Sequence, residues 1–338
     1  MKRLNSKIIA FTTLFISAFS ASAENYSNMY VFGDSLSDTG NLQAVTQDPA
    51  IPGRFTNGPV AAEVIANALG LTLTNSYHLL GGALPFGNNY AIAGAKSVDE
   101  DGDESTPDIN LPTQVNAFLQ IHGGNAPADA LYVILIGGND IRAARGIRAA
   151  GLLANTQEER RAARQAANES LQTAVDSEKA QIMKLIASGA KHIMVVNAPD
   201  IGAIPETDLV ASQLLSAAEN KSEQKKVARL PAITSKLSAK YNQKLARKIG
   251  QIERQSGINI VAYDLLGFLT EQIDAAEDFG YSNVDDACIY VFSAAGAVNP
   301  ECADFPTASG FLFWDEIHPT TKAHQNAGID IVQMLLGN

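Results

Sequence analysis

Residues 30–41 read Tyr-Val-Phe-Gly-Asp-Ser-Leu-Ser-Asp-Thr-Gly-Asn and combine a short apolar run with a serine-bearing turn. Its first three residues are apolar and favour a β-strand, which Gly33, Asp34 and Ser35 then break into a tight turn. Such a turn presents the Ser35 hydroxyl at the carboxyl edge of a sheet, where open α/β folds bind ligands. The alternative is that Ser35 only caps a following helix.

Apolar segments that favour strands recur along the chain and alternate with segments of helical periodicity. The run Leu131–Ile136 is continuously apolar, as expected for a strand buried on both faces, and it ends at Gly137-Gly-Asn139-Asp140. Residues 141–180 should be mostly helical. The alternation predicts an α/β fold with a parallel sheet and helices on both faces. About five strands are expected, starting near residues 29, 71, 131, 192 and 258.

The N-terminus has the composition of a secretory signal peptide. Three basic residues precede an apolar run at 8–19, and Ala21-Ser-Ala23 follows as an A-x-A cleavage site. The run is shorter than the roughly 20 residues that a membrane-spanning helix needs, which disfavours an uncleaved anchor. We therefore expect residues 1–23 to be removed, residues 24–338 to form a single domain without an integral membrane segment, and the protein to be secreted or periplasmic.

The chain is acidic, with 36 Asp and Glu against 25 Lys and Arg. Loss of the three basic residues in 1–23 moves the formal net charge from -11 to about -14. This charge argues against nucleic acid as a partner and against strong attraction to anionic membranes. A run of carboxylates at 98–108 does not have EF-hand spacing, so a solvated loop is favoured over a calcium site, and no metal is expected.

The chain contains two cysteines, Cys288 and Cys302. In an exported protein an even cysteine count favours a disulfide, which here would staple one short loop. Two free buried thiols are the alternative.

A serine hydroxyl becomes an effective nucleophile only when a base accepts its proton. Among the five histidines, His318 differs because it lies in a loop with Asp315 three residues earlier. That spacing lets the carboxylate meet one imidazole nitrogen and leaves the other free to face a serine. The remaining histidines have ordinary structural interpretations; they are His78, His122, His192 and His324.

Two other features have both a functional and a structural interpretation. Residues 81–95 are rich in glycine, and Gly94 permits close backbone approach to a ligand, but an ordinary loop has the same composition. Arg142, Arg145 and Arg148 follow Asn139 closely. They could reach a substrate head group, although a solvated helix face is favoured.

Four motifs occur in a fixed order and extend over almost the whole chain after residue 23. They are Gly33-Asp-Ser35-Leu-Ser-Asp38 with Gly40-Asn41, Asn89-Tyr-Ala-Ile-Ala-Gly94-Ala95, Gly137-Gly-Asn139-Asp140 and Asp315-Glu-Ile-His318-Pro-Thr320. Each motif alone is weak to moderate, but the four in this order are specific. Together they resemble the GDSL lipase/esterase family, also called SGNH hydrolases.

The resemblance implies a three-layer α/β/α sandwich of the flavodoxin-like kind. It also implies that Ser35 is the nucleophile, His318 the base and Asp315 the residue that orients the base. The backbone N–H groups of Ser35 and Gly94, with the Asn139 side chain, would form the oxyanion hole. The family mechanism requires no metal and no organic cofactor.

The expected function is therefore that of a secreted serine ester hydrolase, acting through an acyl-enzyme on lipid-type carboxylic esters. A short-chain esterase for acetylated carbohydrate or choline-type esters is the first alternative. A non-catalytic surface-binding module that retains the fold is the second. The expected partner is a small-molecule or lipid ester, and we expect a monomer.

Overall fold

The computed structural model of the chain describes residues 26–80, 87–99, 102 and 108–337. The expected signal peptide at 1–23 lies outside the described residues, as do residues 81–86 and most of the acidic run at 98–108. Within the described part, no helix combines the length and apolarity that crossing a bilayer requires.

A parallel sheet with the strand order β1-β2-β3-β4 forms the centre of the fold. The strands span Met29–Gly33, Leu131–Leu135, His192–Val196 and Ile260–Tyr263, in that order. The strands predicted near residues 29, 131, 192 and 258 are therefore confirmed. Parallel pairing aligns the carboxyl ends, so that Gly33 lies opposite Leu135 at one edge of the sheet.

The strand expected to start near residue 71 is not formed. Instead, Asn89 extends the sheet at its β1 edge through an isolated parallel bridge to Val31. The Asn88 side chain explains the difference, because its Oδ1 accepts the Thr74 N–H at 2.8 Å and its Nδ2 donates to the Thr72 carbonyl at 2.8 Å. A side-chain amide thus satisfies backbone groups that strand pairing would otherwise use. The main sheet consequently has four strands where about five were expected.

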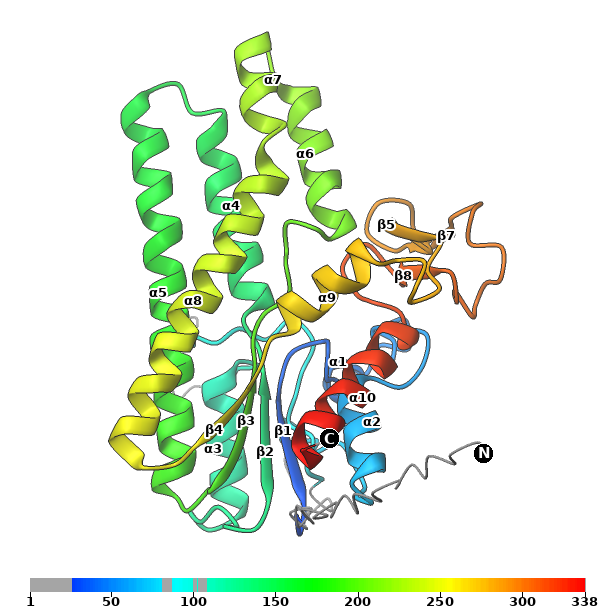
Figure 1. The fold of residues 1–338 in the computed structure, drawn as a ribbon. Coiled ribbons are helices and arrows are strands. Elements are labelled where there is room, and N and C mark those ends of the chain that lie inside the picture. Colours follow the sequence, from blue (N-terminus) through cyan, green and yellow to red (C-terminus); the bar gives the residue numbers. More distant parts are fainter. Residues whose placement is uncertain (1–25, 81–86, 100–101, 103–107, 338) are drawn as a thin grey trace, which may run out of the picture.

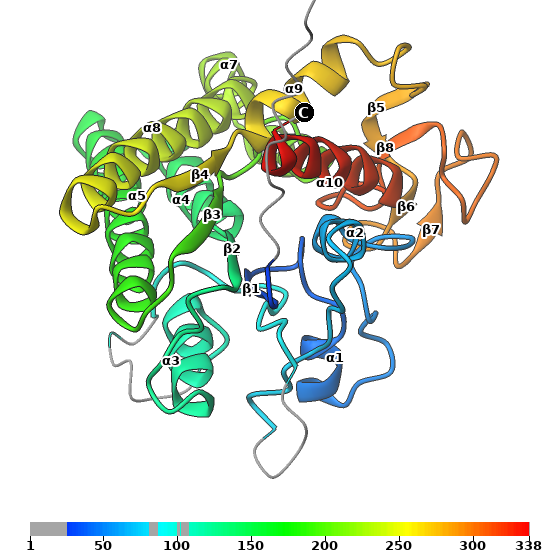
Figure 2. The same ribbon diagram turned by 60° about the horizontal axis from the view of Figure 1, so that its bottom comes forward.

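Side chains alternate between the two faces of the sheet, as the two-residue period of a strand requires. In β2, Leu131 and Val133 enter one apolar cluster, whereas Tyr132 and Ile134 enter the other. The first cluster is covered by α2 (Ala61–Ala68) and α10 (Thr321–Leu336), and the second by α3 (Leu111–Ile121), α5 (Gln157–Ala187) and α8 (Leu230–Ser256). Figures 1 and 2 show these two helical layers on opposite sides of the sheet. The predicted three-layer α/β architecture is confirmed.

A group of helices projects beyond the carboxyl edge of the sheet (Figure 1). We call it the helical extension; it consists of α4 (Gly138–Leu152), α6 (Pro205–Ala217) and α7 (Lys221–Val227), with the adjoining ends of α5 and α8. It has an apolar cluster of its own, built from Ala149, Leu152, Ala211, Val227 and Leu230. The helix predicted over 141–180 is interrupted before α5, where Thr156 and Glu159 form a reciprocal capping box.

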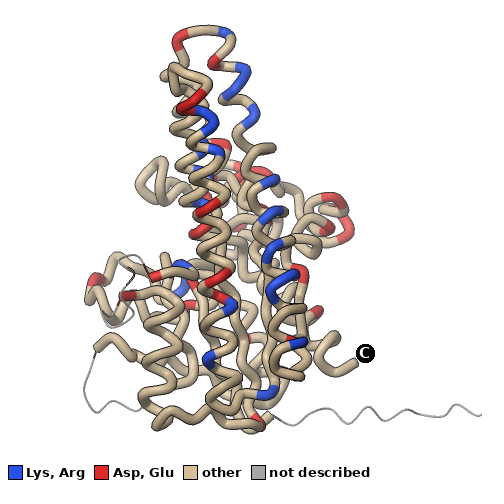
Figure 3. The backbone as a smooth tube through the Cα atoms, turned by 90° about the vertical axis from the view of Figure 1, so that its left-hand side faces the viewer, with Lys and Arg blue, Asp and Glu red and all other residues tan. Residues whose placement is uncertain are grey.

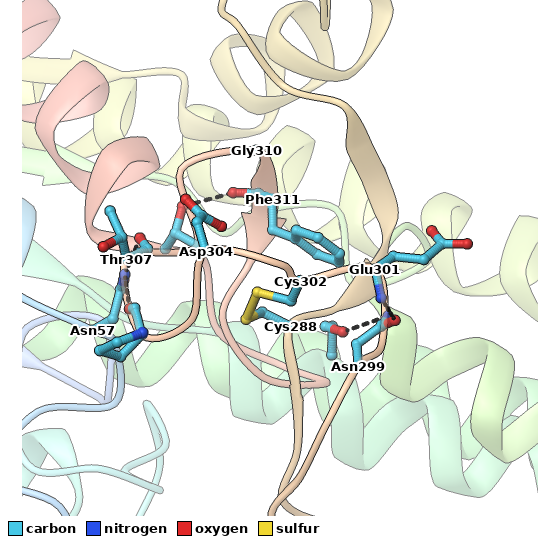
Figure 4. Close-up of a disulfide and its surroundings, with 12 residues drawn as sticks. Asn57, Cys288, Asn299, Glu301, Cys302, Asp304, Thr307, Gly310 and Phe311 are labelled. Carbon is cyan, nitrogen blue, oxygen red and sulfur yellow. Dashed lines mark hydrogen bonds between the residues drawn. A yellow bond between two sulfur atoms is a disulfide. The ribbon is translucent and has the colours of Figure 1, made fainter.

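The remaining elements are short and lie mostly near the end of the chain. They are α1 (Asn41–Thr46), α9 (Leu265–Asp274), β5 (Asn283–Ala287), β6 (Ile289–Tyr290), β7 (Ala297–Val298) and β8 (Phe311–Phe313). The predicted disulfide between Cys288 and Cys302 is formed, with the two Cα atoms 5.3 Å apart (Figure 4). It closes the loop that carries β6 and β7. Asn57 joins this region to the rest of the fold by donating to the Thr307 carbonyl at 2.7 Å.

Candidate active site

Ser35 lies in the turn that directly follows β1. The Asp34 carbonyl accepts the Asp38 N–H at 3.0 Å, and Asp34 Oδ1 accepts the Leu36 N–H at 3.1 Å, so Asp34 closes the turn with both backbone and side chain. Burial raises the pKa of Asp34 to about 6. The first helix begins only at Asn41, so Ser35 does not cap it. The capping alternative for this serine is therefore wrong.

Two buried polar side chains hold the end of β1 and the loops beside it. Gln114 from α3 both accepts the Gly33 N–H and donates to the Gly33 carbonyl, each at 2.8 Å. Asp38 is fully buried, and its carboxylate accepts the Ala93 N–H at 2.8 Å, which ties the loop containing Gly94 to the serine turn. The same carboxylate also accepts the N–H groups of Gly40, Asn41 and Leu42. No role was predicted for Gln114 or Asp38 from the sequence. For Gln114, the available signal was a single amide side chain on the buried face of a helix.

His318 connects the serine turn to the last loop before α10. Its Nε2 lies 2.8 Å from Ser35 Oγ, across 283 positions of sequence. Its Nδ1 lies 2.9 Å and 2.8 Å from the two Asp315 carboxylate oxygens. Asp315 Oδ1 also accepts the backbone N–H groups of Ile317 and His318, at 2.8 and 2.7 Å. The structure therefore brings Ser35, His318 and Asp315 into one hydrogen-bonded line.

The loop that carries His318 is fixed by Glu316, which sequence reasoning also missed. Its buried carboxylate accepts the backbone N–H groups of Val291 (2.9 Å) and Ser293 (2.9 Å) in the disulfide-closed loop. At the start of the His318 loop, the Trp314 N–H donates to the His318 carbonyl at 2.8 Å. These contacts restrain the imidazole position from the backbone, which favours a single orientation of the ring.

The proposed oxyanion donors lie around the same serine turn. Gly94 has a φ of 88°, a conformation that favours glycine. Among the described residues, no acceptor bonds to the backbone N–H of Ser35 or of Gly94. Asn139, at the start of α4, donates from Nδ2 to the Ala95 carbonyl at 2.9 Å. An amide nitrogen carries two N–H groups, so one of them remains for a substrate oxygen.

Two of the three arginines that follow Asn139, Arg142 and Arg145, do not form the solvated helix face that was expected. Arg142 donates from Nη1 to Asn139 Oδ1 at 2.9 Å and pairs through its fork with Glu206 of α6. Arg145 is buried and also pairs with Glu206, at 2.8 Å. The Glu206 N–H donates to the Glu316 carbonyl at 2.7 Å. Glu206 thus links the helix of Asn139 to the loop of His318, and its pKa is held below the usual range by both arginines despite partial burial.

A buried chain of hydroxyl and carboxyl groups lies behind Asn139. The Asp140 carboxylate accepts both the N–H (2.9 Å) and the hydroxyl (3.1 Å) of Ser97, whose hydroxyl lies 3.1 Å from Tyr241 Oη. Tyr241 donates to Glu178 at 2.7 Å. Burial raises the pKa of Asp140 to about 6 and that of Glu178 to about 8. These hydrogen bonds hold the loop after Gly94 against the first turn of α4.

The other histidines are occupied elsewhere in the fold. His324 in α10 accepts the Ala61 N–H at 3.2 Å, and burial lowers its pKa to about 3, so it stays neutral. Burial likewise lowers the pKa of His78 to about 4. The His122 ring lies 3.0 Å from the Tyr30 hydroxyl.

A pocket opens at the Ser35 hydroxyl. It is partly open to solvent, and its walls include Ser35, Asn139, Arg142 and His318. Most of the other lining residues are apolar; they include Leu36, Leu135, Val196, Ile201, Leu265 and Phe313. Asp315 and Gly94 are not among the residues that line the pocket. Asp315 contacts the lining residue His318, and Gly94 precedes Ala95, whose carbonyl accepts from the lining residue Asn139. The arrangement suits an apolar substrate whose reacting group meets a few polar side chains.

Within residues 26–80, 87–99, 102 and 108–337, no three His, Cys, Asp or Glu side chains are grouped as metal ligands. Most of the acidic run at 98–108 lies outside these residues, so the calcium alternative there is not tested.

Several named proteins are similar to this chain in sequence. The chain is 31% identical to Lipase 1 of Photorhabdus luminescens over 92% of its own length, but it spans only 50% of that relative. It is 25% identical to the phosphatidylcholine-sterol acyltransferase of Aeromonas hydrophila, covering 88% of this chain and 87% of the relative. A solved structure of an extracellular lipase from Streptomyces rimosus aligns over 91% of this chain and 99% of its own, with 17% identity and a TM-score of 0.38.

The family model described as GDSL-like Lipase/Acylhydrolase matches residues 29–331, from the first strand of the sheet into the last helix. The match includes all four motifs and every side chain of the hydrogen-bonded line at Ser35. The chain therefore belongs to the GDSL-like lipase/acylhydrolase family.

Proposed function

We propose that the protein hydrolyses lipid-type carboxylic esters through an acyl-enzyme formed on Ser35. The observation that carries the proposal is the line from Ser35 Oγ through His318 to Asp315, with contacts of 2.8 Å on either side of the imidazole. A hydroxyl, a base and an orienting carboxylate in this order are the parts that acyl transfer by serine requires.

In the first half-reaction Ser35 Oγ attacks the ester carbonyl carbon while His318 Nε2 accepts the hydroxyl proton. Negative charge then develops on the carbonyl oxygen, where the N–H groups of Ser35 and Gly94 and the free N–H of Asn139 would stabilise it. Asp315 holds the imidazole so that Nδ1 carries a proton and Nε2 is free to accept one. The alcohol leaves after protonation by His318, and water hydrolyses the acyl-enzyme by the same steps.

The apolar walls of the pocket support a lipid-type acyl group. Asp34 is the one carboxylate among the described lining residues, and it is engaged in closing the serine turn, so the walls offer no free carboxylate for a choline-type cation. The names of the Photorhabdus luminescens lipase and the Aeromonas hydrophila acyltransferase agree with a lipid substrate. The second relative also favours a further possibility, transfer of the acyl group to an alcohol instead of water.

The decisive experiment is a panel of esters of increasing acyl length, together with phospholipids and lysophospholipids, assayed on purified protein and on its Ser35→Ala variant. We expect turnover of medium and long acyl chains and its abolition in the variant, with the fold retained by circular dichroism. Substantial activity in pure Ser35→Ala protein would remove the assignment. Activity that falls steeply beyond butyryl esters would favour the short-chain alternative, and absence of turnover and of fluorophosphonate labelling would favour a binding module.

We further propose that residues 1–23 are removed during export and that residues 24–338 act as a single-domain monomer outside the cytoplasm. The disulfide between Cys288 and Cys302 supports this location, because such bonds persist in oxidising compartments. Intact-mass analysis of protein recovered from the periplasm and the medium tests the cleavage site, and light scattering tests the monomer.

A further inference from the structure

The helical extension carries a surface groove with an unusual charge. Its walls come from α4, α5, α7 and the start of α8, and they contain six basic residues but no aspartate or glutamate. The six are Arg148, Arg160, Arg164, Lys226, Arg229 and Lys236. We call this feature the basic groove. In a chain of formal net charge -11 it is a local reversal of sign, and Figure 3 shows basic positions along the helices on this side of the molecule.

The charges of the basic groove are not neutralised within the described part of the chain. None of the six side chains forms an ion pair there, whereas Arg142 and Arg145 on the same α4 helix are both paired with Glu206. The carboxylate of Glu159 caps α5 and forms no ion pair with a groove residue in the described part, although it is attracted by the charge of the neighbouring Arg160. The pKa of Arg148 is lowered, first by burial and then by the nearby charge of Arg164.

Contacts between α5 and α8 follow a regular pattern that changes at the basic groove. Lower on the two helices, lysines of α8 reach oxygen acceptors on α5 at successive steps of four residues: Lys248 with Asp176, Lys244 with Gln172 and Lys240 with Asn168. One step further up, the matching positions are Lys236 and Arg164, and both line the basic groove. At the α5 position where an oxygen acceptor would continue the pattern, the residue is Arg164, a second cation. Like charges that line one groove repel, and a bound anion would relieve the repulsion.

We propose that the basic groove is a docking site for the phosphate groups of an anionic lipid surface. Guanidinium groups match phosphate oxygens with paired N–H donors, and the groove offers four of them. Its lining also includes Leu152 and Ile233, along which the aliphatic stems of the basic side chains can lie. The choice of lipid over free phosphate rests on the proposed lipid-ester function.

The basic groove and the Ser35 pocket share α4 but no wall residue. Arg148 lies nine residues after Asn139, which corresponds to about 14 Å along the helix axis and to about two and a half turns, so the two side chains leave α4 on opposite sides. Docking at the groove would therefore hold the protein at a lipid surface without covering the pocket opening at Ser35. The acidic total charge, which argued against such membranes, averages over the chain and does not report this local cluster.

The test uses vesicles of ether-linked lipids, which contain no ester to hydrolyse, with and without phosphatidylglycerol. Wild-type protein should bind the phosphatidylglycerol vesicles, and binding should weaken as salt is raised. The variant Arg164→Glu/Arg229→Glu/Lys236→Glu should bind at least about 100-fold more weakly, at about fivefold for each lost cation. The matched control is Arg161→Glu/Lys221→Glu/Lys225→Glu, whose exposed residues lie on α5 and α7 outside the groove walls and change the net charge equally.

Loss of binding in the groove variant with binding retained in the control supports the proposal. An equal loss in both variants would overturn it, because net charge alone would then explain binding. Absence of wild-type binding would also overturn it, as would binding of pyrophosphate without binding of vesicles. Hydrolysis of a soluble short-chain ester, measured in parallel, should be unchanged in both variants. That assay tests the proposed function separately, since failure of turnover leaves the vesicle result intact.

Discussion

Replacing Asp315 by asparagine should remove most of the activity while leaving the fold in place. Asp315 Oδ1 accepts two backbone N–H groups, and both carboxylate oxygens lie within 2.9 Å of His318 Nδ1. An asparagine would keep its oxygen where the two backbone donors require an acceptor. Its NH₂ group would then face Nδ1 in place of Oδ2.

That arrangement forces His318 into the wrong tautomer. An NH₂ group can only donate, so Nδ1 must act as acceptor, and the ring proton moves to Nε2. Nε2 then can no longer accept the proton of Ser35, from which it lies 2.8 Å away. A change of this kind in a serine, histidine and aspartate site lowers turnover by about 10⁴, which corresponds to about 5.5 kcal/mol in the activation free energy.

The assay is kcat/KM for a soluble short-chain ester, with thermal unfolding measured on the same samples. Because the two backbone hydrogen bonds are kept, the unfolding midpoint should change by no more than a few degrees. A loss of less than tenfold in kcat/KM would refute the reasoning, since it would mean that Asp315 only fixes the loop backbone. A large fall in the midpoint would instead indicate that the asparagine side chain is turned the other way.

Two other changes test stability. The double variant Cys288→Ser/Cys302→Ser opens a loop whose ends are separated by 14 positions. Because the disulfide restricts the unfolded chain, its loss should lower the free energy of unfolding, measured by urea titration, by about 3 kcal/mol. A change below about 1 kcal/mol would contradict this explanation. Burial raises the pKa of Glu178 from 4.5 to about 8, so the folded state keeps a proton that the unfolded state releases, and the stability contribution of this group falls as pH rises between those values. Glu178→Gln, which still accepts from Tyr241, should therefore stabilise the protein at pH 8 and have little effect near pH 4; a uniform effect at both pH values would argue against the shift.

The layered fold could be predicted because its main signals are local. The apolar runs at β1, β2, β3 and β4 are strong enough to be recognised without knowledge of their neighbours. The prediction of a strand at 71–74 was wrong because the backbone there bonds to the Asn88 side chain, which lies 14 positions after Thr74. The helical extension was missed for a related reason, since helical composition at 141–180 does not reveal where the helix turns back or which helices pack on it.

The candidate site divides in the same way. The contact between Asp315 and His318 is a short-range one, so spacing alone predicts it. By contrast, the role of Arg142 depends on Glu206, which lies 64 positions later and pairs with it across two helices. Gln114, Asp38 and Glu316 were missed because their partners are backbone groups of loops that become neighbours only in the folded chain.

Residue order and spacing were sufficient to predict the alternation of strands and helices, the order of the four motifs, the cysteine pair and the contact of Asp315 with His318. These depend on periodicity and on residues a few positions apart. Two features follow only from the folded chain: Ser35 meets His318 across 283 positions, and six cations from four helical segments share one groove in an acidic chain. Contacts of that kind depend on how the sheet and helices close on one another, and neither residue spacing nor total charge contains that information.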